Sequence, residues 1–108
     1  MSDSKNKKFL PIGSIVMLEG GQMPVMIIGY TVVARDGSNR IYDYNATFYP
    51  MGTIDNSVVT PFNHKQIKEV IFYGYEDDLS KEYRENLKKA DAYYRLSNLV
   101  NPEYKGDE

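Results

Sequence analysis

The segment RIYDYNATFYPMG, residues 40–52, alternates apolar with polar side chains. Its apolar members are Tyr42, Tyr44, Ala46 and Phe48, and its polar members are Asp43, Asn45 and Thr47. A period of two predicts a β-strand over about 40–49 with an aromatic face. Burying apolar surface contributes about 25 cal/mol per Å², whereas buried polar groups without partners are costly. We therefore predict that the aromatic face lies in the core and that the three polar side chains face water.

Further strands are predicted on both sides of this segment. Residues 14–19 and 25–33 are apolar runs separated by GGQMP, whose glycines suit a chain reversal. Asp36-Gly37 is a strong hairpin signal before the tyrosine-bearing strand. Residues 70–75, VIFYGY, have the β-branched and aromatic composition of a strand. Residues 51–61 are predicted to form a loop or a weak edge strand, and FNHKQIKEV a short helix with Asn63 as its N-cap.

The clearest helix is predicted over about 79–99. Its apolar stripe comprises Leu79, Tyr83, Leu87, Ala90 and Tyr94, which recur every three or four residues. The acidic residues 76–78 precede it, at the positive end of the helix dipole. We expect the stripe to cover one face or the open end of the sheet.

The predicted fold class is α+β, with four or five antiparallel strands in a curled, half-barrel-like sheet and one C-terminal amphipathic helix. At 108 residues the chain is one domain at most. We expect a disordered N-terminal tail over 1–8, a single domain over 9–100 and a polar C-terminal tail over 101–108.

Composition and net charge exclude several classes of protein. The formal net charge is −2 and the pI about 5.4, which is unlike the basic footprint of a nucleic-acid-binding protein. The chain has no Cys, so it has neither a disulfide framework nor a cysteine metal site. No apolar run has the length of a secretory or membrane-spanning segment. These features predict a cytoplasmic, soluble protein that binds no nucleic acid. A small barrel that stacks nucleotides on its tyrosines is a weaker alternative.

Catalytic signals are weak. His64 is the only histidine, and no G-x-S-x-G elbow or spaced set of metal ligands accompanies it. A histidine beside a helix start more often has a structural or capping role. We therefore predict that the protein is not an enzyme and has no cofactor and no metal.

The strongest interaction signal lies at the end of the predicted helix. In its last two turns the apolar arc widens to include Tyr93, Leu96, Leu99 and Val100. An arc that widens in this way either packs more deeply on the sheet or meets another chain. We take these four residues as the candidate partner-binding site, and the internal packing stays as the alternative.

Four segments in this order, LPIGSIVMLEGG, VMIIGY, YDYNATFYPMG and FNHKQIKEVIFYGYED, carry a family resemblance over about residues 9–78. They resemble a family of small bacterial proteins encoded in type VII secretion gene clusters of Gram-positive bacteria, often beside toxins with an LXG-type N-terminal domain. The resemblance implies a cytosolic accessory role, as a chaperone or targeting adaptor for an exported toxin. The alternative is an immunity protein that neutralises the toxin through its acidic 76–78 patch.

Overall fold

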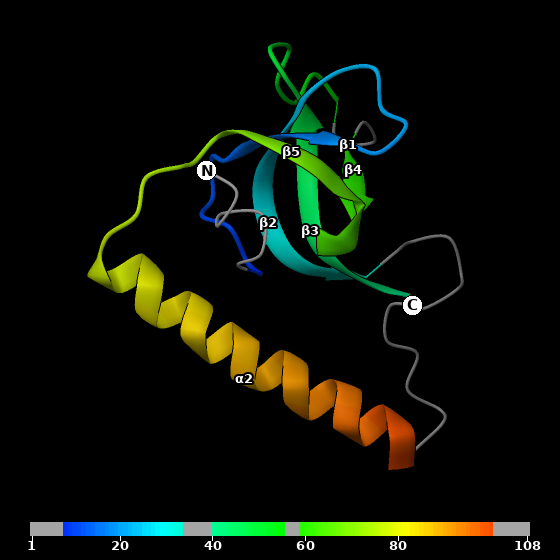
Figure 1. Ribbon diagram of the computed structural model, residues 1–108, viewed down its shortest axis with the longest axis vertical. Helices are drawn as coiled ribbons and strands as arrows, with labels where there is room; N and C mark the ends of the chain where they lie inside the picture. The colour runs from blue at the N-terminus through cyan, green and yellow to red at the C-terminus, as the bar shows by residue number, and fades with distance from the viewer. Residues whose placement is uncertain (1–7, 34–39, 56–58, 101–108) are drawn as a thin grey trace.

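The computed structural model describes residues 8–33, 40–55 and 59–100, and for Val33 and residues 91–100 it describes the backbone alone. In chain order the elements are β1 (Ile15–Leu18), β2 (Val25–Val33), β3 (Ile41–Phe48), β4 (Thr60–Phe62), the 3₁₀ turn η1 (His64–Gln66), β5 (Ile67–Phe72) and α2 (Asp78–Val100). The strands pair antiparallel in the order β4-β3-β2-β1-β5 (Figure 1). The predicted α+β class, a curled antiparallel sheet with one C-terminal helix, is confirmed.

The sheet curls because its two edge strands are joined by a very short connection. In a flat sheet of this size β4 and β5 would lie about 19 Å apart. Residues 63–66 join them, and the 3₁₀ turn advances only about 2 Å per residue. The sheet therefore bends into a half-barrel, in which Leu18 of β1 pairs with Ile67 and the Glu19 N–H donates to the Gln66 carbonyl oxygen over 2.8 Å.

The two longest strands form the centre of the half-barrel. β2 and β3 pair from Val25↔Phe48 to Val33↔Ile41, with one register shift between Ile27 and Gly29. The predicted reversal between β1 and β2 is confirmed, and Gly20 takes the positive φ of 76° that glycine allows without strain.

The tyrosine-bearing strand β3 faces the core as predicted, but only in part. Tyr44 and Ala46 are fully buried, whereas Tyr42 and Phe48 are half-buried. The prediction that the polar members face water is wrong for Asp43 and for Thr47, which are buried, and Asn45 is half-buried.

Two segments distant in sequence cover the outer side of β3 at Asp43. Its Oδ2 accepts a hydrogen bond from the His64 backbone N–H over 2.9 Å, and its Oδ1 lies 3.1 Å from the Lys8 ammonium. The Asp43 N–H in turn donates to Asn63 Oδ1 over 3.1 Å. Alternation along β3 predicts that Asp43 faces water. It is buried instead, because η1 and the N-terminal segment supply partners for both of its carboxylate oxygens.

The N-terminal segment forms part of the core. The Phe9 and Leu10 backbone N–H groups donate to the Tyr44 hydroxyl oxygen over 2.8 and 3.0 Å. Tyr30 on β2 donates its hydroxyl hydrogen to the Leu10 carbonyl oxygen over 2.5 Å. The buried apolar core comprises Phe9, Leu10, Val16, Val25, Ile27, Tyr44, Ala46, Phe62 and Ile67.

Several element boundaries differ from the prediction. The strand expected over 70–75 lies at 67–72, because residues 73–77 form the connection to α2. Of the described residues within 51–61, Thr60 and Pro61 are in a strand, β4. The short helix expected in FNHKQIKEV is the single turn η1, where the Asn63 N–H donates to Gln66 Oε1 over 2.8 Å.

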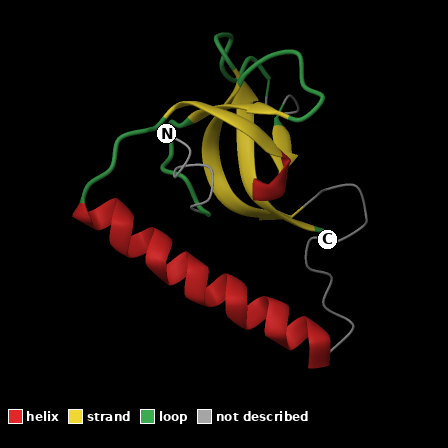
Figure 2. Ribbon diagram, in the orientation of Figure 1, coloured by secondary structure: helices red, strands yellow, loops and turns green. Residues whose placement is uncertain are grey.

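The predicted helix is confirmed as α2, but its expected cover of the sheet is wrong in the first turns. Leu79 and Tyr83 are 77% and 57% exposed, and Ala90 is exposed, whereas Leu87 is half-buried against the core. Figure 2 shows α2 running beside one end of the half-barrel. The curled sheet is already filled by its own residues and by Phe9, so the helix stripe has little left to cover.

Three of the predictions fall mostly or wholly outside the described residues. Two concern the chain ends, namely the tails over 1–8, of which only Lys8 is described, and over 101–108. The third is the Asp36-Gly37 turn. Within the described ranges, no helix has the length and apolar character needed to cross a membrane.

Candidate functional site: a groove between α2 and the half-barrel

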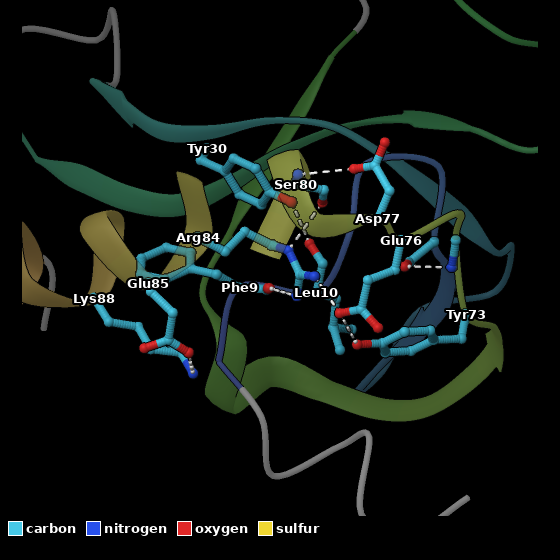
Figure 3. A network of polar contacts seen from close by, with 12 residues as sticks. Phe9, Leu10, Tyr30, Tyr73, Glu76, Asp77, Ser80, Arg84, Glu85 and Lys88 are labelled. Atoms are coloured by element: carbon cyan, nitrogen blue, oxygen red, sulfur yellow. Dashed lines mark hydrogen bonds and ion pairs between the residues drawn. The ribbon is translucent and has the colours of Figure 1, made fainter. Parts of the chain in front are cut away.

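Arg84 joins α2 to the half-barrel. Its side chain is buried, and its guanidinium donates to the Phe9 carbonyl oxygen over 3.1 Å and to the Ser80 hydroxyl over 3.2 Å (Figure 3). The same group forms an ion pair with Glu76, whose Oε2 also accepts a hydrogen bond from the Tyr73 hydroxyl over 3.1 Å. One side chain therefore connects the N-terminal segment, the β5–α2 connection and the helix.

Burial and these contacts shift the pKa values of several groups at the joint, by which we mean the contact of α2 with the half-barrel around Arg84. The Arg84 guanidinium holds the pKa of the Glu76 carboxyl below its usual range. Burial raises the pKa of Tyr30 to about 12, and burial also raises the pKa of Tyr73. All three shifts keep each group in its usual charge state at neutral pH, which suits a structural joint better than a proton-transfer centre.

The first turn of α2 is capped by the connection that precedes it. The Asp77 Oδ1 accepts a hydrogen bond from the Ser80 N–H over 2.8 Å, as N-cap residues do. This cap and the Arg84 contacts fix where α2 begins and hold its first two turns beside β2.

An open groove lies in the angle between these turns and the half-barrel. Its volume is about 700 Å³, and its lining is mainly apolar. The lining residues are Ile12, Gly29, Tyr30, Tyr75, Asp77, Leu79, Ser80, Tyr83 and Arg84. We call this feature the α2 groove.

Large apolar side chains stand exposed around the α2 groove. Tyr75 and Leu79 are 78% and 77% exposed, Tyr83 57% and Ile12 48%. The Tyr83 ring contacts the Tyr30 ring, with centroids 6.2 Å apart, so the groove floor is aromatic. A concave apolar surface of this kind can bind apolar side chains of a ligand or of another protein.

The sequence-predicted partner site lies further along the same helix. Tyr93, Leu96, Leu99 and Val100 belong to the last turns of α2, which confirms that these residues are helical. Their side chains lie outside the described residues, so their role stays a prediction.

His64, the only histidine of the chain, takes part in a structural cluster. Its Nδ1 lies 2.8 Å from the Tyr44 hydroxyl, and its backbone N–H is bound by Asp43. Because the Tyr44 oxygen already accepts two backbone N–H groups, its own hydrogen is the one available to Nδ1. Among the described side chains, no group of three or more His, Cys, Asp or Glu residues is placed to hold a metal ion.

Sequence reasoning missed the α2 groove for two reasons. The exposed Leu79 and Tyr83 lie on a regular apolar stripe, which normally predicts burial. Arg84 was not singled out, although it lies between Ser80 and Leu87 on the barrel-facing side at spacings of four and three residues. An arginine on the inner side of an amphipathic helix is the signal that could have located the joint.

The fold and the groove define a small α+β half-barrel protein with one partly uncovered helix. A family model, described as Domain of unknown function (DUF4176), matches residues 9–83, and the chain belongs to this family. The matched region contains all five strands and the first turns of α2. Comparison with curated proteins and with solved structures found no match.

Proposed function

We propose that this protein is a non-catalytic, cytoplasmic accessory protein of a type VII secretion locus. It binds an exported toxin with an LXG-type N-terminal domain before export, as a chaperone or targeting adaptor. The resemblance carried by the segments between residues 9 and 78 supports the locus context. The α2 groove supports the binding role, and it is the observation on which the proposal mainly depends.

The physical argument is the exposure of the groove. Tyr75, Leu79 and Tyr83 present apolar surface that the rest of the described chain does not cover. Moving such surface out of water favours binding, and aromatic side chains are common at the centre of protein interfaces. A client segment with apolar side chains fits this chemistry.

The alternative, an immunity protein, depends on the acidic patch at 76–78, and the contacts of these residues support it less than the groove supports a chaperone or adaptor. Glu76 is bound by Arg84 and by Tyr73, and one Asp77 oxygen caps α2. Two of the three carboxylates at 76–78 therefore already serve the joint. A direct block of a toxin's active site needs charges that are available to the partner.

Co-expression with the neighbouring toxin's N-terminal domain tests the proposal. The wild-type chain should co-purify with that domain, whereas Leu79→Asp should lose it. Ile54→Asp is the matched control, because Ile54 is 76% exposed but does not line the groove. Equal recovery with both variants, and unchanged circular dichroism, would exclude the groove as the client site.

The extent of the client surface and the role of the protein are tested separately. Leu96→Asp combined with Val100→Asp tests whether the last turns of α2 extend the client surface, and loss of the complex is expected. A chaperone or adaptor changes the amount of toxin exported, whereas an immunity protein rescues cells that express the isolated toxin domain. Rescue without any effect on export would overturn the chaperone role.

A further inference from the structure

One side of α2 next to the groove carries no covering element among the described residues. Leu79, Tyr83, Asn86 and Ala90 recur at spacings of four, three and four residues, so at 3.6 residues per turn they share this side. All four are exposed. We call them the groove-side face. Its spacing is that of a short heptad seam, which is the pattern by which helices pair.

From this pattern we propose that two copies of this chain pair through the groove-side faces of their α2 helices, in antiparallel orientation. The spacing 4-3-4 reads the same in both directions, so a two-fold axis between residues 84 and 85 superimposes the face on itself. Leu79 then lies opposite Ala90 of the second copy, and Tyr83 lies opposite Asn86. A large side chain meets a smaller one at each level, which allows the helices to approach closely.

The charges beside this face favour the same arrangement. Glu82 and Lys89 are both exposed and flank the face at a spacing of seven residues. In the antiparallel pair Glu82 of each copy lies beside Lys89 of the other, so symmetry produces two complementary contacts. A parallel pair would instead set Leu79 against Leu79 and Ala90 against Ala90, which leaves unequal gaps along the seam.

The pairing also carries the last turns of α2 past the start of the second copy's helix. In this register residue 91 of one copy lies level with Asp78, where α2 of the other copy begins. Residues 92–100, which are rich in apolar residues by sequence, therefore extend beyond the paired segment.

This inference does not depend on the proposed function, because it concerns the isolated chain. A self-paired form would shelter apolar surface that a single copy exposes. A client that binds the same face would have to replace the second copy. The purified protein contains no client, so the test of self-pairing gives the same result whether or not the proposed function is correct.

Cysteine cross-linking tests the pairing and its direction, since the chain has no native Cys. Leu79→Cys and Ala90→Cys are purified separately and then mixed under mild oxidation. The two copies of residue 79 lie about 16 Å apart along the antiparallel pair, beyond the reach of a disulfide, and the same holds for residue 90. We expect a covalent dimer only in the mixture. Dimers from each variant alone would overturn the antiparallel arrangement, and no dimer in any sample would overturn the pairing.

A charge exchange provides an independent test that leaves the apolar face intact. Sedimentation of the full chain should show reversible association to twice the monomer mass of 12.4 kDa. Glu82→Lys should weaken this association by on the order of tenfold, and adding Lys89→Glu should restore it. A monomer at all concentrations, or a double variant no better than the single one, would contradict the proposal.

Discussion

The Arg84 guanidinium on α2 donates a hydrogen bond to the carbonyl oxygen of Phe9 over 3.1 Å, and it thereby joins residues 75 positions apart. Phe9 is fully buried, so this bond attaches the helix directly to the core. The rest of the first two turns leaves its apolar side chains exposed. Arg84 therefore sets the position of α2 and, with it, the opening of the α2 groove.

Replacing Arg84 by Met should lower the free energy of unfolding by about 2–3 kcal/mol, because the Phe9 carbonyl and the Glu76 carboxylate lose a charged donor. Urea denaturation monitored by circular dichroism measures this loss. Lys88→Met is the control, since the Lys88 ammonium pairs with the exposed Glu85 among the described side chains, and its effect should stay below about 0.5 kcal/mol. Equal effects would show that Arg84 is not the joint.

Tyr44→Phe should destabilise the fold by about 2–3 kcal/mol, because two buried N–H groups, those of Phe9 and Leu10, lose their common acceptor. Thermal or urea unfolding tests this prediction. Tyr49→Phe, at a position 45% exposed, should change the stability by less than about 0.5 kcal/mol. A Tyr44→Phe variant as stable as the wild type would contradict the role of the Tyr44 hydroxyl in holding the N-terminal segment in the core.

Gly74→Ala should be destabilising by about 1–3 kcal/mol. A Cβ atom at this position would lie 2.5 Å from the Ile12 carbonyl oxygen and 2.9 Å from the Ser14 nitrogen, and both are backbone atoms that cannot move aside easily. Gly29→Ala serves as control, since its nearest neighbour would be Asn45 Cβ at 3.9 Å. If the two variants unfold at the same urea concentration, the close approach at Gly74 is not a constraint.

Stability should fall in acid partly through Glu76. Its pKa is lowered in the folded chain by Arg84, so its contribution is present above the unfolded value of 4.5 and is lost as the pH falls through the folded value. Glu76→Gln should therefore lose less stability than the wild type between neutral pH and about pH 3. Urea unfolding at several pH values measures both curves. Parallel curves would argue against the Arg84–Glu76 coupling.

Local patterns in the sequence predict most of the fold. The period-two alternation in 40–52 identifies β3, the Gly20-Gly21 pair identifies the reversal after β1, and the long stripe identifies α2. These features depend on neighbours within a few residues, so periodicity is enough to find them. The predicted bounds of β5 lie three residues too far toward the C-terminus, because the connection to α2 is rich in tyrosine and resembles a strand in composition.

Contacts between distant segments are the part that the sequence does not predict. Asp43 is buried because Lys8 and the turn at His64 converge on it, and neither neighbour is evident from alternation along β3. The α2 groove also results from contacts between segments that are distant in sequence. A curled sheet closed by Phe9 has no room for the apolar side chains at the start of α2, and the stripe alone cannot show this.

The central claim is that another polypeptide contacts the groove-side face of α2. A photo-cross-linking amino acid in place of Tyr83, which is 57% exposed, tests this in cells, with Ile54 at 76% exposed as the control position. We expect position 83 to yield an adduct that contains peptides of a second copy of this chain or of the neighbouring toxin, and position 54 to yield none. No adduct at position 83, or the same adduct at both positions, would contradict the claim.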